Sequence, residues 1–206
     1  MLYLIFYYLI FLPLQILWHQ RFPQSPQTYS CFCTVDGTDF RIWEPSPFSS
    51  SWYSHKFNGA GIRYEVVLSI HSCDIVAING PFGPGDWNDI AIFRDRTMGM
   101  LLEGERVEAN DGYRGEPGSI DLPGERLGRE GVNILGQWQQ RRRKGWVRAR
   151  HETINRRFKQ FQCLNRVYRH GVGTHALCFR ACVVLTQIGI DYGEHVWDLP
   201  EPYVTL

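Results

Sequence analysis

The stretch Cys31 to Trp43, CFCTVDGTDFRIW, decides the fold, because its β-branched and aromatic residues predict a strand that carries an acid, Asp36, in its middle. Residues 63–70 (RYEVVLSI) and 74–79 (DIVAIN) predict two more strands, joined by a hairpin through 71–73. These three strands predict an antiparallel unit at one side of a mixed sheet.

Helical and strand patterns follow this unit, and together they predict an α/β fold with a mixed sheet flanked by helices. The predicted elements are a helix capped by Asp86 or Asn88 and running to 103, a strand at 106–110, one more short strand (VNIL) within 120–136, and helices at 145–168 and 175–190. The helix at 145–168 has one apolar stripe, made of Ile154, Phe158, Phe161, Leu164 and Tyr168.

Composition and charge exclude some classes of protein. The chain has 206 residues, 44% apolar and 21% charged, which suits one folded domain and excludes a mostly disordered chain. The net charge is +1, but residues 141–169 hold eleven Lys or Arg and a single acid, Glu152. Such a block predicts phosphate contacts, and the alternative for a charge run alone is a solvated helix face. The six cysteines lack zinc-ligand spacing, so free thiols are expected.

The N-terminus, Met1 to Trp18, is almost wholly apolar. Three readings remain open: a membrane span, a buried helix left from a larger N-terminal region, and a wrongly assigned start. Residues 19–30 are rich in Pro, Gln and Ser and read as a linker. The expected division is an apolar segment with its linker at 1–29 and one domain at 30–206.

Three acidic positions stand out: Asp36 in the first strand, the NDGY stretch at 110–113, and Glu152 on the cationic helix. Mg²⁺ prefers hard oxygen ligands, and acids from separate elements that meet at strand ends can supply them. Asn155, Arg156 and Lys159 share the face of Glu152. This helix face therefore predicts a metal-ligand acid flanked by phosphate-binding cations, and the alternative is an ordinary Glu–Arg pair.

An ordered set of motifs resembles the DDE transposase domain of the Harbinger-like group, over about residues 30–198. The motifs are VDGTDFRIWEP, WYSHKFNGAGIRYEV, DIVAINGPFGPGDWNDIAIFR, EANDGYRGE and RARHETINRRFKQF. The resemblance implies a ribonuclease-H-like fold and a two-metal endonuclease and strand-transfer site that uses Mg²⁺ or Mn²⁺. It also implies that Asp89 corresponds to a family acid near the site, although a helix cap is the alternative.

Carried over residue by residue, the first family Asp falls on Asp36, and the Glu falls on Glu152, seven residues before Lys159 as in the family. The second Asp falls on Asn110, with an acid one residue later at Asp111. Since an amide offers no charge, the resemblance implies weakened or lost catalysis. Rescue by Asp111 requires that the turn reorient this side chain. A non-catalytic DNA-binding relic is the alternative to an enzyme.

The implied partner is DNA, and a nuclear location goes with it unless residues 1–18 span a membrane. The residues expected to contact DNA are Arg141, Arg142, Arg143, Lys144, Arg148, Arg150, Arg156 and Lys159, and His55 and Lys56 lie in a loop that could also meet DNA. No helix-turn-helix fits before the first strand, so a separate DNA-binding partner protein is expected. A homo-oligomer is left open.

Overall fold

The computed structural model describes residues 16–22, 31–122 and 134–198, with side chains included except at 134–141 and 143. Six strands form one mixed sheet, in the order β2–β3–β1–β5–β6, and β4 also pairs with β3. The strands are β1 (Cys31–Arg41), β2 (Tyr53–Ser54), β3 (Gly59–Ser69), β4 (Ile75–Phe82), β5 (Arg106–Glu108) and β6 (Ile120–Asp121). The helices are α2 (Asp89–Asp95), α3 (Ile134–Phe158), α4 (Gln162–Asn165) and α5 (Val172–Asp191), and short 3₁₀ turns are η2 (Trp18–Arg21), η3 (Ser50–Trp52), η4 (Met98–Met100) and η5 (Asp111–Tyr113).

The long central strand β1 joins an antiparallel half of the sheet to a parallel half. It runs antiparallel to β3, which is in turn antiparallel to β4, whereas β5 and β6 are parallel to it on its other side. This arrangement is compatible with a ribonuclease-H-like fold, and it confirms the predicted α/β class. The crossover from β4 to the parallel strand β5 carries α2.

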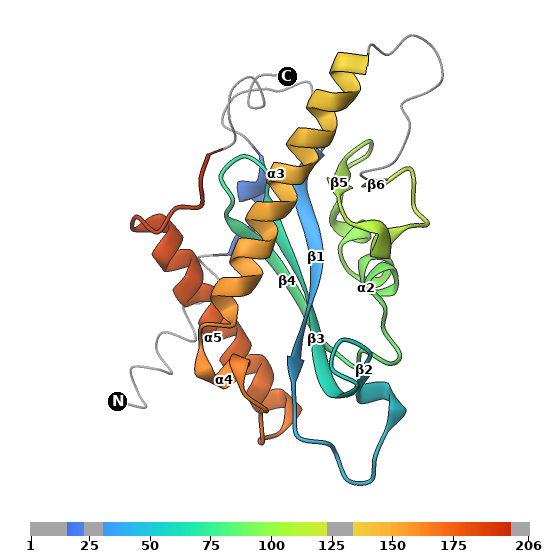
Figure 1. Ribbon diagram of the computed structural model, residues 1–206, viewed down its shortest axis with the longest axis vertical. Coiled ribbons are helices and arrows are strands. Elements are labelled where there is room, and N and C mark those ends of the chain that lie inside the picture. The colour runs from blue at the N-terminus through green and yellow to red at the C-terminus, as the bar shows by residue number, and fades with distance from the viewer. Residues whose placement is uncertain (1–15, 23–30, 123–133, 199–206) are drawn as a thin grey trace.

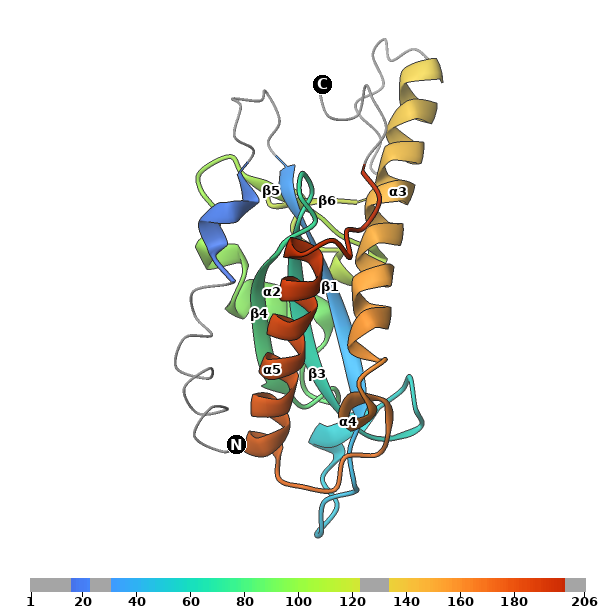
Figure 2. The same cartoon turned by 90° about the vertical axis from the view of Figure 1, so that its left-hand side faces the viewer.

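Helices cover both faces of the sheet, with α3 and α5 on one face and α2 on the other (Figures 1 and 2). The residues of β1 alternate between these two faces. Phe40 and Ile42 belong to the core under α3 and α5, whereas Cys33 and Val35 belong to the core under α2. A strand buried on both faces is expected to be apolar, so Asp36 is out of place by packing alone.

Several predicted elements end elsewhere. Asn88 caps α2 by accepting from the Ala91 N–H, and this helix stops at Asp95, well before residue 103. The prediction of a strand at VNIL was wrong for its described residues, because Ile134 begins α3. The short strand in this region is β6 instead. The helix predicted at 145–168 ends at Phe158, yet its apolar stripe packs in the core because α4 turns back onto the sheet.

Most of the apolar N-terminal segment, 1–15, lies outside the described residues. From Trp18 the chain forms the turn η2, and the indole N–H of Trp18 donates to the carbonyl of Met100. Among the described helices, α5 alone is long and apolar enough to cross a membrane, and 44% of its apolar window is buried. A core helix of a soluble protein meets the same criteria.

Candidate functional site

Asp36, Asn110 and Glu152, from three separate elements, line one cavity of about 50 Å³. The strands β1 and β5 pair only as far as Thr34 and Glu108, so a gap opens beyond the end of β5, and α3 closes it from one side. Ligand sites in α/β sheets form at such points, where neighbouring connections leave in opposite directions. The complete lining is Thr34, Val35, Asp36, Glu108, Ala109, Asn110, Arg148, His151 and Glu152.

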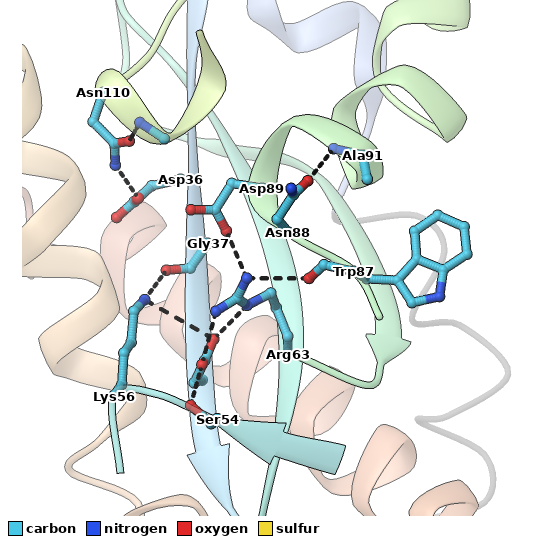
Figure 3. Close-up of polar contacts among 12 residues, drawn as sticks. Asp36, Gly37, Ser54, Lys56, Arg63, Trp87, Asn88, Asp89, Ala91 and Asn110 are labelled. Carbon is cyan, nitrogen blue, oxygen red and sulfur yellow. Dashed lines mark hydrogen bonds and ion pairs between the residues drawn. The ribbon is translucent and has the colours of Figure 1, made fainter. Parts of the chain in front are cut away.

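Two side-chain amides hold the carboxylate of Asp36. The Nδ2 of Asn110 donates to its Oδ1 at 2.9 Å (Figure 3), and the Nδ2 of Asn155 donates to its Oδ2 at 3.0 Å. Burial raises the pKa of Asp36, and Lys56, the Gly37 N–H, Arg148 and Lys159 act against that rise. Asn155 was placed on the Glu152 face from helical spacing, and its contact with Asp36 shows that this face covers the cavity.

Asn110 has one possible orientation. Its Oδ1 accepts from the Gly112 N–H at 2.8 Å and caps η5, while its Nδ2 faces Asp36. A flipped amide would set its oxygen against the Asp36 carboxylate and its NH₂ against the Gly112 N–H. The amide oxygen therefore points away from Asp36. A metal ion bound beside Asp36 would need this oxygen on the Asp36 side.

Glu152 lies on the same side of the sheet as Asp36, since both line the cavity, and its side chain is exposed. The cavity lining holds three carboxylates, Asp36, Glu152 and the 3% exposed Glu108 at the end of β5, while position 110 turns an N–H donor toward Asp36. Within the described residues, no group of three or more His, Cys, Asp or Glu side chains is arranged to hold a metal ion. The three positions named by the resemblance do not fit a tightly bound Mg²⁺ or Mn²⁺, because Asn110 offers neither a charge nor a free oxygen on the Asp36 side.

Asp111 does not bring a carboxylate into the cavity. It begins η5, its side chain is 75% exposed, and it forms an ion pair with Arg114 at 2.9 Å. Asp111 is not among the residues that line the cavity. The turn does reorient this side chain, but it points it toward solvent, so rescue by Asp111 is not supported.

Asp89 lies beside the site, on the α2 face of the sheet, and it is not the helix cap, which is Asn88. Its carboxylate is in an ion pair with Arg63 at 3.3 Å (Figure 3). A Cβ on Gly37 would overlap Asp89 Oδ1, and a Cβ on Gly112 would lie 2.9 Å from both Asp89 Oδ2 and Asn110 Oδ1. The glycines of VDGT and NDGY are therefore needed because this carboxylate packs between their backbones.

A buried ion network supports β1 immediately beyond Gly37 (Figure 3). Asp39 accepts from Arg63 at 2.7 and 3.0 Å and from the Ser54 hydroxyl at 2.7 Å. Although burial raises the pKa of Asp39, Arg63, Lys56 and Ser54 outweigh it and lower that pKa. Lys56 also donates to the Gly37 carbonyl at 3.2 Å, so this predicted loop residue lies next to the site.

Sequence reasoning missed His151 and Thr34, which form part of the cavity wall. The Nδ1 of His151 lies 2.8 Å from the Thr34 hydroxyl, and burial lowers the pKa of His151 to about 3, so the ring is neutral. Two positional signals were available. Thr34 lies two residues before Asp36 on the same strand face, and His151 directly precedes Glu152.

The cationic block separates into an exposed set and a buried set. Arg148 and Arg156 are exposed on α3, Lys159 is exposed directly after its last residue, and Arg148 also lines the cavity. Lys144 is buried against Asp121 at 2.7 Å, and Arg150 is buried and donates to the Ile70 carbonyl at 2.8 Å. Because both side chains are engaged inside the fold, the structure does not support the predicted DNA contact for these two residues.

Of the remaining predicted DNA contacts, Arg142 is exposed on α3, whereas the side chains of Arg141 and Arg143 lie outside the described part of the structure. Comparison of the chain with protein-family models, with curated proteins and with solved structures finds no match in any of the three. The function proposed below therefore depends on the fold, the cavity and the exposed cations of α3.

Proposed function

We propose that this chain is a DNA-binding domain of the DDE transposase type, similar to the Harbinger-like group, in which metal-dependent cleavage is weakened or lost at residue 110. The observation that carries the proposal is the convergence of Asp36, Asn110 and Glu152, from β1, the end of β5 and α3, on one cavity. These are the positions at which the motif resemblance expects three metal ligands.

The exposed cations of α3 supply the DNA-binding part of the proposal. Arg148 borders the cavity, Arg156 lies further along α3 and Lys159 follows its end, so a phosphate backbone lying along α3 would pass the mouth of the cavity. Each phosphate neutralised by Lys or Arg releases counterions. The slope of log K against log salt is therefore proportional to the number of phosphate contacts. A nuclear location and a separate sequence-specific partner protein belong to the same proposal.

DNA binding is tested by fluorescence anisotropy with duplex DNA over a salt series. Replacing Arg148, Arg156 and Lys159 together by Gln is expected to reduce the slope of log K against log salt by about 2 to 3. The matched control replaces three exposed arginines on the α2 side, Arg94, Arg96 and Arg114, by Gln, with the same change in charge. No binding by the natural chain, or equal loss in both variants, would overturn the proposal.

Cleavage is tested by nicking of supercoiled DNA with Mn²⁺. The natural chain is expected to be inactive or very weak, and Asn110→Asp is expected to raise the rate, because Asp supplies the missing anionic ligand for Mg²⁺ or Mn²⁺. Strong nicking by the natural chain would remove the claim of weakened catalysis. Absence of nicking in both forms would leave a DNA-binding domain and remove the enzyme reading.

A further inference from the structure

Two cysteines from neighbouring helices meet beside the end of α3. Cys163 lies on α4 and Cys182 on α5, and their sulfur atoms are 3.7 Å apart. The helices α4 and α5 pack together and follow α3 along the chain (Figures 1 and 2). This contact has no place in the proposed DNA-binding function, and it is independent of the cavity.

The two thiols differ in exposure, as a peroxide-sensitive pair requires: one thiol must be open to peroxide, and the other must lie next to it to form the disulfide. All six cysteines lie in the described residues and are free thiols, and Cys163 is the exposed one among them. Cys182 is 4% exposed and belongs to the main core. A third thiol, Cys178, is one helical turn from Cys182, but its sulfur faces the Tyr168 hydroxyl at 3.5 Å.

We infer that Cys163 and Cys182 form a reversible disulfide when the protein meets a peroxide, which makes this pair an oxidative modification site. A disulfide needs a sulfur separation of about 2.05 Å, so the sulfurs have to approach by roughly 1.7 Å. The helix α4 has only four residues, Gln162–Asn165, and irregular segments flank it, so a small shift of this helix closes the gap.

The reaction is balanced with hydrogen peroxide as the two-electron oxidant. The exposed Cys163 sulfur attacks one peroxide oxygen, the O–O bond breaks, and a sulfenic acid and water result. The Cys182 sulfur then attacks the Cys163 sulfur, the S–O bond breaks, and hydroxide leaves with the thiol proton as a second water. A dithiol such as dithiothreitol reverses the bond and is itself oxidised.

Burial of Cys182 controls the rate of the second step. Desolvation raises its pKa, and the neighbouring Cys163 raises it further, so little thiolate is present at neutral pH. Because the thiolate is the attacking species, the disulfide is expected to form slowly and faster with rising pH. The crosslink closes a chain segment between α4 and α5, and it is expected to raise Tm by roughly 5 to 10 °C.

Peptide mapping tests the pairing directly, because trypsin separates the three thiols. Cleavage after Lys159, Arg166, Arg169 and Arg180 places Cys163 in peptide 160–166, Cys178 in peptide 170–180 and Cys182 in peptide 181–206. The full chain is treated with stoichiometric hydrogen peroxide, blocked with iodoacetamide and digested without reductant. The expected product joins 160–166 to 181–206 and disappears with dithiothreitol.

Two variants sharpen the test. Cys163→Ser is expected to abolish the crosslink and the Tm increase, whereas Cys178→Ser, the matched control from the same cluster, is expected to leave both unchanged. Joining of 160–166 to 170–180, an intermolecular dimer through Cys163, or Cys163 sulfinic acid without any crosslink would each overturn the inference.

Discussion

The substitution Asn110→Asp tests whether the cavity binds a metal ion once residue 110 carries a carboxylate. The amide nitrogen of Asn110 now lies 2.9 Å from Asp36 Oδ1 and donates to it. The other carboxylate oxygen of an Asp at this position would keep the bond from the Gly112 N–H, as the present amide oxygen does at 2.8 Å. The substitution thus replaces the hydrogen bond between residues 110 and 36 by two carboxylates. These repel each other unless a cation lies between them.

The size of the effect follows from the distances. Two unit charges 4 Å apart repel by about 4 kcal/mol at an effective dielectric constant of 20, and proton uptake by the pair relieves part of this. Without metal we therefore expect the variant to lose about 1–3 kcal/mol in free energy of unfolding. A divalent ion at 100 times its Kd returns about 2.7 kcal/mol, which corresponds to roughly 5–10 °C in Tm.

The assay is thermal unfolding with EDTA and with 10 mM MnCl₂ (about 100 times an assumed Kd of 0.1 mM). The natural chain is expected to respond to Mn²⁺ by less than about 1 °C. The double variant Asn110→Asp/Asp111→Asn keeps the net charge of the natural chain and should show the same Mn²⁺ response as Asn110→Asp alone. Adding Glu152→Gln should remove that response. If Asn110→Asp is no more sensitive to Mn²⁺ than the natural chain, the three positions do not form a metal site.

Three further predictions concern stability. Burial raises the pKa of Glu65 to about 7 from 4.5, so the folded state binds this proton more tightly than the unfolded state. Stability should therefore fall by about 3 kcal/mol as pH rises from 4.5 to 7, and Glu65→Gln should flatten this dependence in chemical denaturation. Gly37→Ala should cost about 1–3 kcal/mol by overlap with Asp89, and the added change Asp89→Ala should recover part of that loss. Arg150→Met should cost about 1–3 kcal/mol, because the Ile70 carbonyl loses its donor, yet leave the salt slope of DNA binding unchanged.

Much of the fold could be predicted because its signals are local. The strand at 31–43, the hairpin through 71–73 and the apolar helix at 175–190 each depend on composition or on a period of two or 3.6. The break after Phe158 could not be predicted from the stripe alone. The residues of the stripe that follow Phe158, as far as Tyr168, remain apolar because α4 returns this part of the chain to the same core. The strand β2 has only two residues, too few for a periodic signal.

The site was predictable as a set of positions but not as a set of contacts. Motif order identified Asp36, Asn110 and Glu152, and helical spacing placed Asn155 on the correct face. Charge counting could not distinguish Arg150 from Arg156, because both lie in the same cationic run, while one is 3% exposed and the other faces solvent. Which cation is buried depends on long-range partners such as the Ile70 carbonyl.

The contacts around Asn110 show what a neutral amide contributes to the fold at this position. Its Nδ2 donates to Asp36, while its Oδ1 and Asp89 Oδ2 each lie 2.9 Å from where a Cβ on Gly112 would be. A neutral amide beside these partly buried carboxylates avoids the repulsion that a third carboxylate would add. Burial already raises the pKa of both Asp36 and Asp89. The amide therefore stabilises the metal-free fold, so under the proposed function stability and metal affinity should change in opposite directions at this one position.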